Sequence, residues 1–360
     1  MTEVHPLGFP AAARDRGRFL FTVAVIALLT ASGCALIRLI PEAAAPLADA
    51  APAGTAHLEP ARRIMAPFGE LREIRAPDTE AVVLAHPGNE ELADRLAAEL
   101  PAALSAVAGF WDASETAWTR HAVVVVAADR TEFAALLRAP EPAAGGPQTG
   151  ADAGAVPGGH ARSDTAGSRR SDDSGATAVD VTSTDIAAAA FSDPFVFGTS
   201  PTGQRVVFAP DAGERLTPDQ LRTLLRHELT HLATRAHTAG DAPQWLTEGF
   251  ADYVAHRGLG HTFAEIAPTV RAAARSGALP DAFPADTAFT GPAAVEAYEQ
   301  AWTICAFVAA AYDEPRLLHL YRTLAGSGRA DEDRLLREVL GTDRASFADR
   351  WRSWVADRSG

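Results

Sequence analysis

The stretch that most constrains the fold is "LTPDQLRTLLRHELTHLATRAH" at 216–237, because its ends and its spacing both favour one long helix. Thr217 followed three residues later by Gln220 forms a capping box, and Pro218 suits the first helical position. Leucines recur at helical spacing, at 221, 224, 225 and 232. The sequence therefore predicts a helix of about five turns, with residues 227–231 well inside it.

Two histidines in this predicted helix have the spacing of metal ligands. His227 and His231 are four residues apart, so they project from one face on successive turns. Two imidazoles placed in this way can bind one tetrahedral Zn²⁺, and Glu228 stands beside them to take a proton from the water that the zinc activates. The same pattern can arise by chance on an ordinary helix. Whether it marks a metal site therefore depends on whether a third ligand follows downstream.

One candidate for the third ligand is His237, six residues after His231. This is the spacing of the metzincin pattern H-E-x-x-H-x-x-G-x-x-H. That pattern needs a glycine where Thr234 stands, and a methionine after the motif, whereas the methionines of this chain are Met1 and Met65. His237 is better explained as a cation near the carboxyl end of the helix.

The other candidate is Glu248, in "DAPQWLTEGFADYVAHRG" at 241–258. Pro243 near the start and Gly258 after the end predict a second helix there. A carboxylate on a helix packed against the first one can reach the metal. Asp252, one turn later on the same face, is placed to accept the second ring N–H of a ligand histidine, a support that zinc ligands usually have.

These residues together resemble a known family. "LLRHELTHLATR" followed by "PQWLTEGFADYVA" is similar to the gluzincin branch of the zinc metallopeptidases, especially the bacterial peptidase-MA-like domains with an H-E-x-x-H…W-L-x-E-G-x-A pattern. The resemblance covers about 80–355 in the order of elements and is tight at 224–254. The Gly-x-Met-Glu-Asn stretch of aminopeptidase-N-like gluzincins is missing, which lowers the odds of an aminopeptidase.

The resemblance implies hydrolysis of peptide bonds at a zinc site, with a peptide or protein as the substrate. The resemblance implies that His227, His231 and Glu248 bind the zinc and that Glu228 is the general base. It also implies that Asp252 supports a ligand histidine from behind and that Tyr298 stabilises the oxyanion. Two alternatives remain: a metzincin-like peptidase that uses His237, and a cell-surface binding module whose zinc site is structural.

The fold class expected from the whole chain is α+β and zincin-like, with a small mixed sheet and helices in the amino-terminal half and a mainly helical carboxyl-terminal half. Strands are predicted at 80–86 and 121–128, and "FVFG" at 195–198 and "RVVFA" at 205–209 are predicted to form a hairpin or successive strands. A helix is predicted to follow the first strand, with Pro101 kinking or splitting it.

The amino terminus predicts a membrane anchor. Residues 1–40 contain a basic flank and the uncharged run "FLFTVAVIALLTASGCALI" at 19–37, typical of a secretion signal. "ASGC" at 31–34 resembles a lipoprotein box, with Cys34 as the lipidated residue, and the run is also long enough for a single transmembrane span. The chain after it is expected to lie outside the cytoplasm.

The remaining organisation follows from composition. Residues 41–60 are predicted to be an Ala/Pro-rich linker and 61–360 a metallopeptidase domain, with a disordered insertion at about 140–180 where Gly, Pro, Ser and Asp dominate. The net charge of −14 argues against nucleic acid as a partner, since such binding requires a cationic surface.

Overall fold

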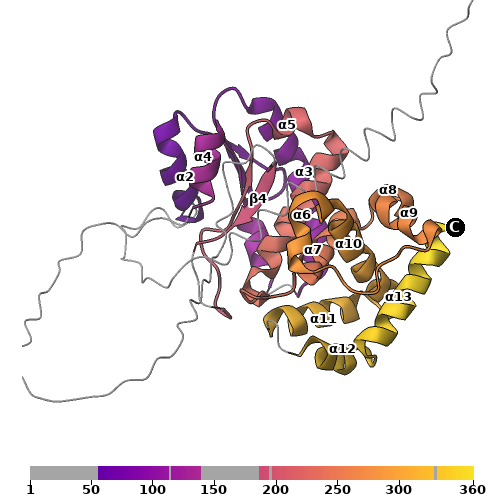
Figure 1. Ribbon diagram of the computed structural model, residues 1–360. Coiled ribbons are helices and arrows are strands. Elements are labelled where there is room, and N and C mark those ends of the chain that lie inside the picture. The colour runs from indigo at the N-terminus through magenta and orange to yellow at the C-terminus, as the bar shows by residue number, and fades with distance from the viewer. Residues whose placement is uncertain (1–55, 113–114, 139–185, 194–196, 328–330) are drawn as a thin grey trace, which may run out of the picture.

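The computed structural model describes residues 56–112, 115–138, 186–193, 197–327 and 331–360. The amino-terminal half contains both strands and helices, whereas from α5 (Ala212–Arg215) onward every regular element among the described residues is a helix. Figure 1 shows this helical half beside the layer that contains the sheet. The expected α+β class with a small mixed sheet is confirmed. The predicted anchor at 1–40 with Cys34, most of the linker at 41–60 and the insertion at 140–180 lie outside the described residues.

The sheet has five short strands in the order β1-β2-β3-β5-β4. These are β1 (Arg72–Arg75), β2 (Val82–Ala85), β3 (Val123–Val126), β4 (Ala188–Phe191) and β5 (Arg205–Phe208). The three central strands are parallel, and β1 and β4 pair antiparallel at the two edges. The central strands are buried at every residue, which explains their continuous apolar sequence.

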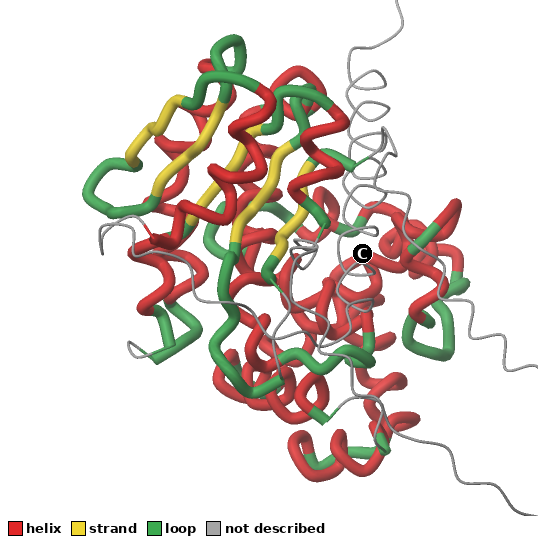
Figure 2. The backbone as a smooth tube through the Cα atoms, turned by 90° about the vertical axis from the view of Figure 1, so that its left-hand side faces the viewer, coloured by secondary structure: helices red, strands yellow, loops and turns green. Residues whose placement is uncertain are grey.

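Helices cover both faces of the sheet, as Figures 1 and 2 show. Along β2, Val83 and Ala85 join the core formed with α3 (Glu90–Ala108) and α6 (Pro218–Thr234). Val82 and Leu84 join the other core, formed with α2 (Glu59–Met65) and α4 (Arg130–Leu136). The period-two alternation of the strand thus places α6 firmly against one face.

One sequence prediction about the sheet is wrong, and one strand was not predicted. Phe197 and Gly198 of the predicted "FVFG" strand lie in a turn, and the strand that pairs with β5 is "AAAF" at 188–191. The edge strand β1, with the sequence "REIR", was not predicted, because its largely exposed side chains lack an apolar pattern.

Helix α3 continues through Pro101 as one helix, so the expected split does not occur. A proline inside a helix costs about 3 kcal/mol. Leu96, Leu100 and Leu104 are buried on both sides of the proline, and each contributes about 1.5–3 kcal/mol by its burial. Burial of the leucine stripe therefore outweighs the cost of the proline.

The helical half is built around α10 (Ala294–Ala311), which packs against α7 (Gln244–His256) and α11 (Glu314–Gly326). Short helices α8 (Phe263–Ile266) and α9 (Pro268–Ser276) follow α7, and α12 (Glu332–Leu340) and α13 (Arg344–Ser359) end the chain. Within the described ranges, the helices are too short or too polar to span a membrane.

Candidate metal centre

Helix α6 begins as the sequence predicts. Thr217 Oγ1 accepts the backbone N–H of Gln220 at 3.3 Å, and Gln220 Oε1 accepts the backbone N–H of Thr217 at 2.8 Å. The capping box is confirmed, and it fixes where the helix starts. His227 and His231 both lie on a buried part of this helix, and their Nε2 atoms are 3.0 Å apart.

Helix α7 packs against α6 and brings Glu248 to the two histidines. Glu248 Oε2 lies 3.4 Å from Nε2 of His227 and 3.7 Å from Nε2 of His231. One ligand atom from each of the three residues lies within 4.8 Å of the others, and all three side chains are buried. The connection between the helices carries His237, but the residue that joins the pair of histidines is Glu248.

Asp252 determines which nitrogen of His227 faces this group. Asp252 Oδ1 lies 2.8 Å from Nδ1 of His227. Because the carboxylate can only accept, Nδ1 carries a proton, and Nε2 is the ring nitrogen that faces His231 and Glu248. Burial alone would lower the pKa of His227, but the Asp252 carboxylate and its hydrogen bond raise that pKa well above the ordinary value.

The three side chains fit a divalent cation. Zn²⁺ in tetrahedral coordination, with bonds of about 2.0–2.1 Å, separates its ligand atoms by about 3.3 Å, and the observed separations of 3.0, 3.4 and 3.7 Å bracket this value. Both oxygens of Glu248 are buried and have no hydrogen-bond partner in the described part of the chain. Burial favours the neutral form of Glu248, but the two histidines hold the pKa of its carboxyl well below the usual range. A buried carboxylate needs a cationic partner, and a divalent cation held by these three side chains would supply one.

Glu228 lies on the same helix between the two histidines and is also buried. Its Oε2 accepts the backbone N–H of Ala190 in β4 at 2.7 Å, which orients the carboxylate. Burial raises the pKa of Glu228 above its ordinary value. A carboxylate with a raised pKa beside a metal centre is suited to accept and return a proton.

The other two predicted residues lie as follows. His237 stacks on Trp111 with ring centroids 5.5 Å apart, and its Nε2 is 3.5 Å from Oε1 of Glu115. It is thus held against another part of the molecule. Tyr298 lies on α10, where its buried ring packs edge-on against Phe289 at 5.1 Å; its role at the oxyanion stays a prediction.

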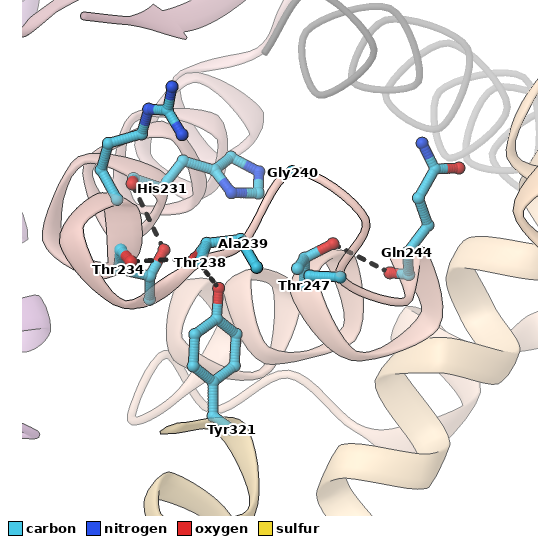
Figure 3. Close-up of a pocket in the computed structure, with 10 residues that line it drawn as sticks. His231, Thr234, Thr238, Ala239, Gly240, Gln244, Thr247 and Tyr321 are labelled. Carbon is cyan, nitrogen blue, oxygen red and sulfur yellow. Dashed lines mark hydrogen bonds between the residues drawn. The ribbon is translucent and has the colours of Figure 1, made fainter. Parts of the chain in front are cut away.

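A small cavity that the sequence did not reveal lies beside this centre, at the place where α6 ends and α7 begins (Figure 3). It shares His231 with the group of three and has a volume of about 30 Å³. Its lining comes from the end of α6, the connection that follows, the start of α7 and one tyrosine of α11: His231, Thr234, Arg235, Thr238, Ala239, Gly240, Ala242, Gln244, Thr247 and Tyr321. Apart from His231, no metal-ligand motif marks these residues, so only the folded arrangement could identify them as a group.

The fold and the buried group define an α+β protein with a candidate metal centre of two histidines and a glutamate. Residues 216–357 match the sequence model of a family described as the Peptidase MA superfamily. The matched region contains all three side chains of the centre. The match supports a peptidase-MA-like domain in this part of the chain and a peptidase activity that depends on a metal. No curated protein and no solved structure was found to match the chain.

Proposed function

We propose that the protein is a zinc-dependent peptidase of the gluzincin type, in which His227, His231 and Glu248 hold Zn²⁺. One observation carries the proposal: a ring nitrogen from each of two histidines and a buried carboxylate without hydrogen bonds among the described residues converge on one point. Nitrogen and oxygen ligands in this number, with one position left for water or substrate, are the donor set of catalytic zinc sites.

The chemistry follows from the side chains around that point. Zn²⁺ held there supplies Lewis acidity to the scissile carbonyl and lowers the pKa of water. Glu228 takes a proton from the attacking water and later gives it to the leaving nitrogen, so a C–O bond replaces the C–N bond and an acid and an amine result. Asp252 keeps the Nδ1 proton on His227, and Tyr298 stabilises the oxyanion.

The peptide substrate is proposed to lie along β4. Among the described strands, β4 pairs only with β5, so its other edge can take an extended chain. The N–H of Ala190 in this strand binds Glu228, so the strand runs directly past the proposed base. A peptide added to this edge would therefore pass the metal centre.

We also propose that the enzyme acts outside the cytoplasm, held at the membrane by residues 1–40 through a lipid on Cys34 or through a transmembrane span. The support is the basic flank, the apolar run and "ASGC". Labelling of cells with a radioactive fatty acid separates the two: incorporation that Cys34→Ser abolishes supports the lipid, and membrane association without incorporation supports the span.

The central test compares metal content and peptide hydrolysis in three variants. Glu228→Gln should retain Zn²⁺ and lose hydrolysis, which a structural zinc site would not require. Glu248→Ala should lose Zn²⁺, while His237→Ala should keep it, which separates the gluzincin arrangement from the metzincin one. Hydrolysis that survives both Glu228→Gln and a chelator would refute the proposal.

A further inference from the structure

Two further histidines face each other at the carboxyl end of α7, outside the candidate metal centre. His256 is the last residue of α7 and His261 lies in the loop that follows, and their Nδ1 atoms are 2.8 Å apart. We propose that this histidine pair, His256 and His261, binds a divalent transition-metal cation, Cu²⁺ in preference to Zn²⁺. The inference goes beyond the proposed peptidase function and does not depend on it.

The loop between α7 and α8 brings the two rings together. Gly258 and Gly260 have φ angles of +71° and +78°, which glycine adopts without the steric penalty of other residues. The chain therefore turns back between the two histidines. Thr262, which follows the second histidine, forms a capping box with Glu265 at the start of α8. One ring is thus held by the helix before the loop and the other by the helix after it.

A carboxylate behind His261 determines which of its nitrogens faces His256. Asp219 Oδ2, in the first turn of α6, lies 2.8 Å from Nε2 of His261. Because a carboxylate can only accept, Nε2 carries a proton, and in the neutral ring Nδ1 is the nitrogen with a free lone pair. Histidines that bind metals usually have such a carboxylate behind them.

His256 can supply the second nitrogen. Burial lowers the pKa of His256 to about 4, against an opposing effect of Asp252, so the ring is neutral at pH 7. Without a metal, Nδ1 of His256 donates its proton to Nδ1 of His261. With a metal, the proton of His256 moves to its Nε2, which changes no net charge and leaves a lone pair on Nδ1.

The distance between the two nitrogens distinguishes between metals. Two ligands at 90° with bonds of about 2.0 Å are about 2.8 Å apart, whereas tetrahedral ligands are about 3.3 Å apart. The observed 2.8 Å matches the 90° angle of a tetragonal cation. Cu²⁺ and Ni²⁺ prefer this geometry, and Cu²⁺ binds nitrogen ligands more tightly than the other divalent metals of its row. Among the described residues, no third side chain of a ligand type joins the pair, so water would complete the coordination.

The charges around the pair favour a cation. Asp219 is in contact with it, and the carboxyl groups of Asp252 and Glu265 interact with its two rings. Arg226 acts in the opposite direction. Arg222 contacts Asp219 at 3.2 Å, but it also shares its charge with a glutamate of α3 at 2.8 Å. The pair lies at the carboxyl end of α7, where the helix dipole favours a positive charge.

The test adds one molar equivalent of Cu²⁺ to the full-length protein after its candidate metal centre has been loaded with Zn²⁺. Electron paramagnetic resonance should show tetragonal Cu²⁺ with splitting from two nitrogen ligands. Elemental analysis after desalting should show that the zinc is retained beside the copper. Copper that binds only by displacing the zinc would overturn the proposal.

Variants assign the copper to the pair. His261→Ala should lose this spectrum, and Asp219→Asn should weaken Cu²⁺ binding about 10- to 100-fold, because the support behind the ring loses its charge. His319→Ala, at an exposed histidine of α11, is the matched control and should bind Cu²⁺ as the wild type does. An unchanged spectrum and affinity in His261→Ala would overturn the proposal.

Thermal unfolding gives a second measurement that needs neither zinc nor hydrolysis. Cu²⁺ bound by the pair joins the end of α7 to the loop before α8, so it should raise the Tm of the wild type. The side chain of His261 is 18% exposed, and His261→Asn keeps a polar group there, so this variant should fold without metal. A copper-induced rise in Tm that is equal in wild type and His261→Asn would overturn the site. Absence of hydrolysis by the zinc-loaded wild type would overturn the peptidase function alone.

Discussion

Gly249→Ala tests whether the close approach of α7 to α10 holds Glu248 at the metal centre. Gly249 directly follows Glu248. A Cβ atom at this position would lie 2.3 Å from the carbonyl oxygen of Ala301, 2.6 Å from its carbon and 3.0 Å from Sγ of Cys305. Ordinary contact begins at 3.4 Å, so the helices must separate by about 1 Å. The atoms of Ala301 are backbone atoms, which cannot rotate away.

Two free-energy terms set the effect on folding. Alanine is favoured over glycine inside a helix by about 1 kcal/mol. Overpacking costs about 1–3 kcal/mol, and a clash with backbone belongs at the upper end. The free energy of unfolding should therefore fall by about 1–2 kcal/mol. The effect on the metal should be larger, because ligand distances tolerate about 0.2 Å and Glu248 moves with α7. We expect the affinity for Zn²⁺ to fall at least about 100-fold.

The assay measures both quantities on the same protein. Urea unfolding of the metal-free form gives the stability, and competition with a fluorescent chelator gives the affinity for Zn²⁺. Gly109→Ala, at the end of α3, is the control, because the nearest atoms to its Cβ lie at 3.6 Å and should accept it. A folded Gly249→Ala protein that binds Zn²⁺ as the wild type does would refute the reasoning.

Two further predictions concern groups around the centre. Asp252→Asn should weaken Zn²⁺ binding about 10- to 100-fold with little change in stability, because the hydrogen bond at 2.8 Å to His227 loses its charge; an unchanged affinity in the chelator competition would contradict this. Glu299, on α10, accepts the backbone N–H groups of Thr269 and Val270 at 2.6 and 2.9 Å, and its burial raises its pKa to about 7. The folded protein thus keeps Glu299 protonated where the unfolded chain has ionised it. The wild type should lose about 3 kcal/mol relative to Glu299→Gln as the pH rises from about 4.5 to about 7. Urea unfolding of both proteins across this range checks the sign, and a difference that does not vary with pH would disprove it.

Sequence reasoning worked where one residue type is required by local chemistry. The capping box of Thr217 and Gln220 needs only four consecutive residues, and the structure forms it as predicted. The convergence of His227, His231 and Glu248 follows from two helices that each carry a strong pattern. The roles of these three residues in holding zinc stay predictions, as do Glu228 as the base and Tyr298 at the oxyanion.

Prediction from the sequence failed where tertiary packing determines the local structure. The strand β4 is "AAAF", and alanine has little preference for strands. Its backbone is held by β5 on one side, and the N–H of Ala190 is bound by Glu228 of α6. The more apolar "FVFG" matches the strand pattern better, yet its described residues form a turn. Pairing with neighbours therefore outweighed the intrinsic preference of the segment.

The dependence on tertiary packing also explains why no sequence pattern indicated the cavity, whereas the spacing of His227, His231 and Glu248 indicated a metal site. Metal chemistry restricts ligands to a few residue types, so their spacing can be recognised in a chain. The cavity is lined by threonine, alanine, glycine, arginine and glutamine, which occur at helix ends in any protein. What distinguishes Arg235 and Gln244 is that one follows α6 and the other begins α7, and that the connection between them closes a small space against His231. The shape of this space is therefore set by the length and path of the α6–α7 connection, which no local pattern in the sequence records.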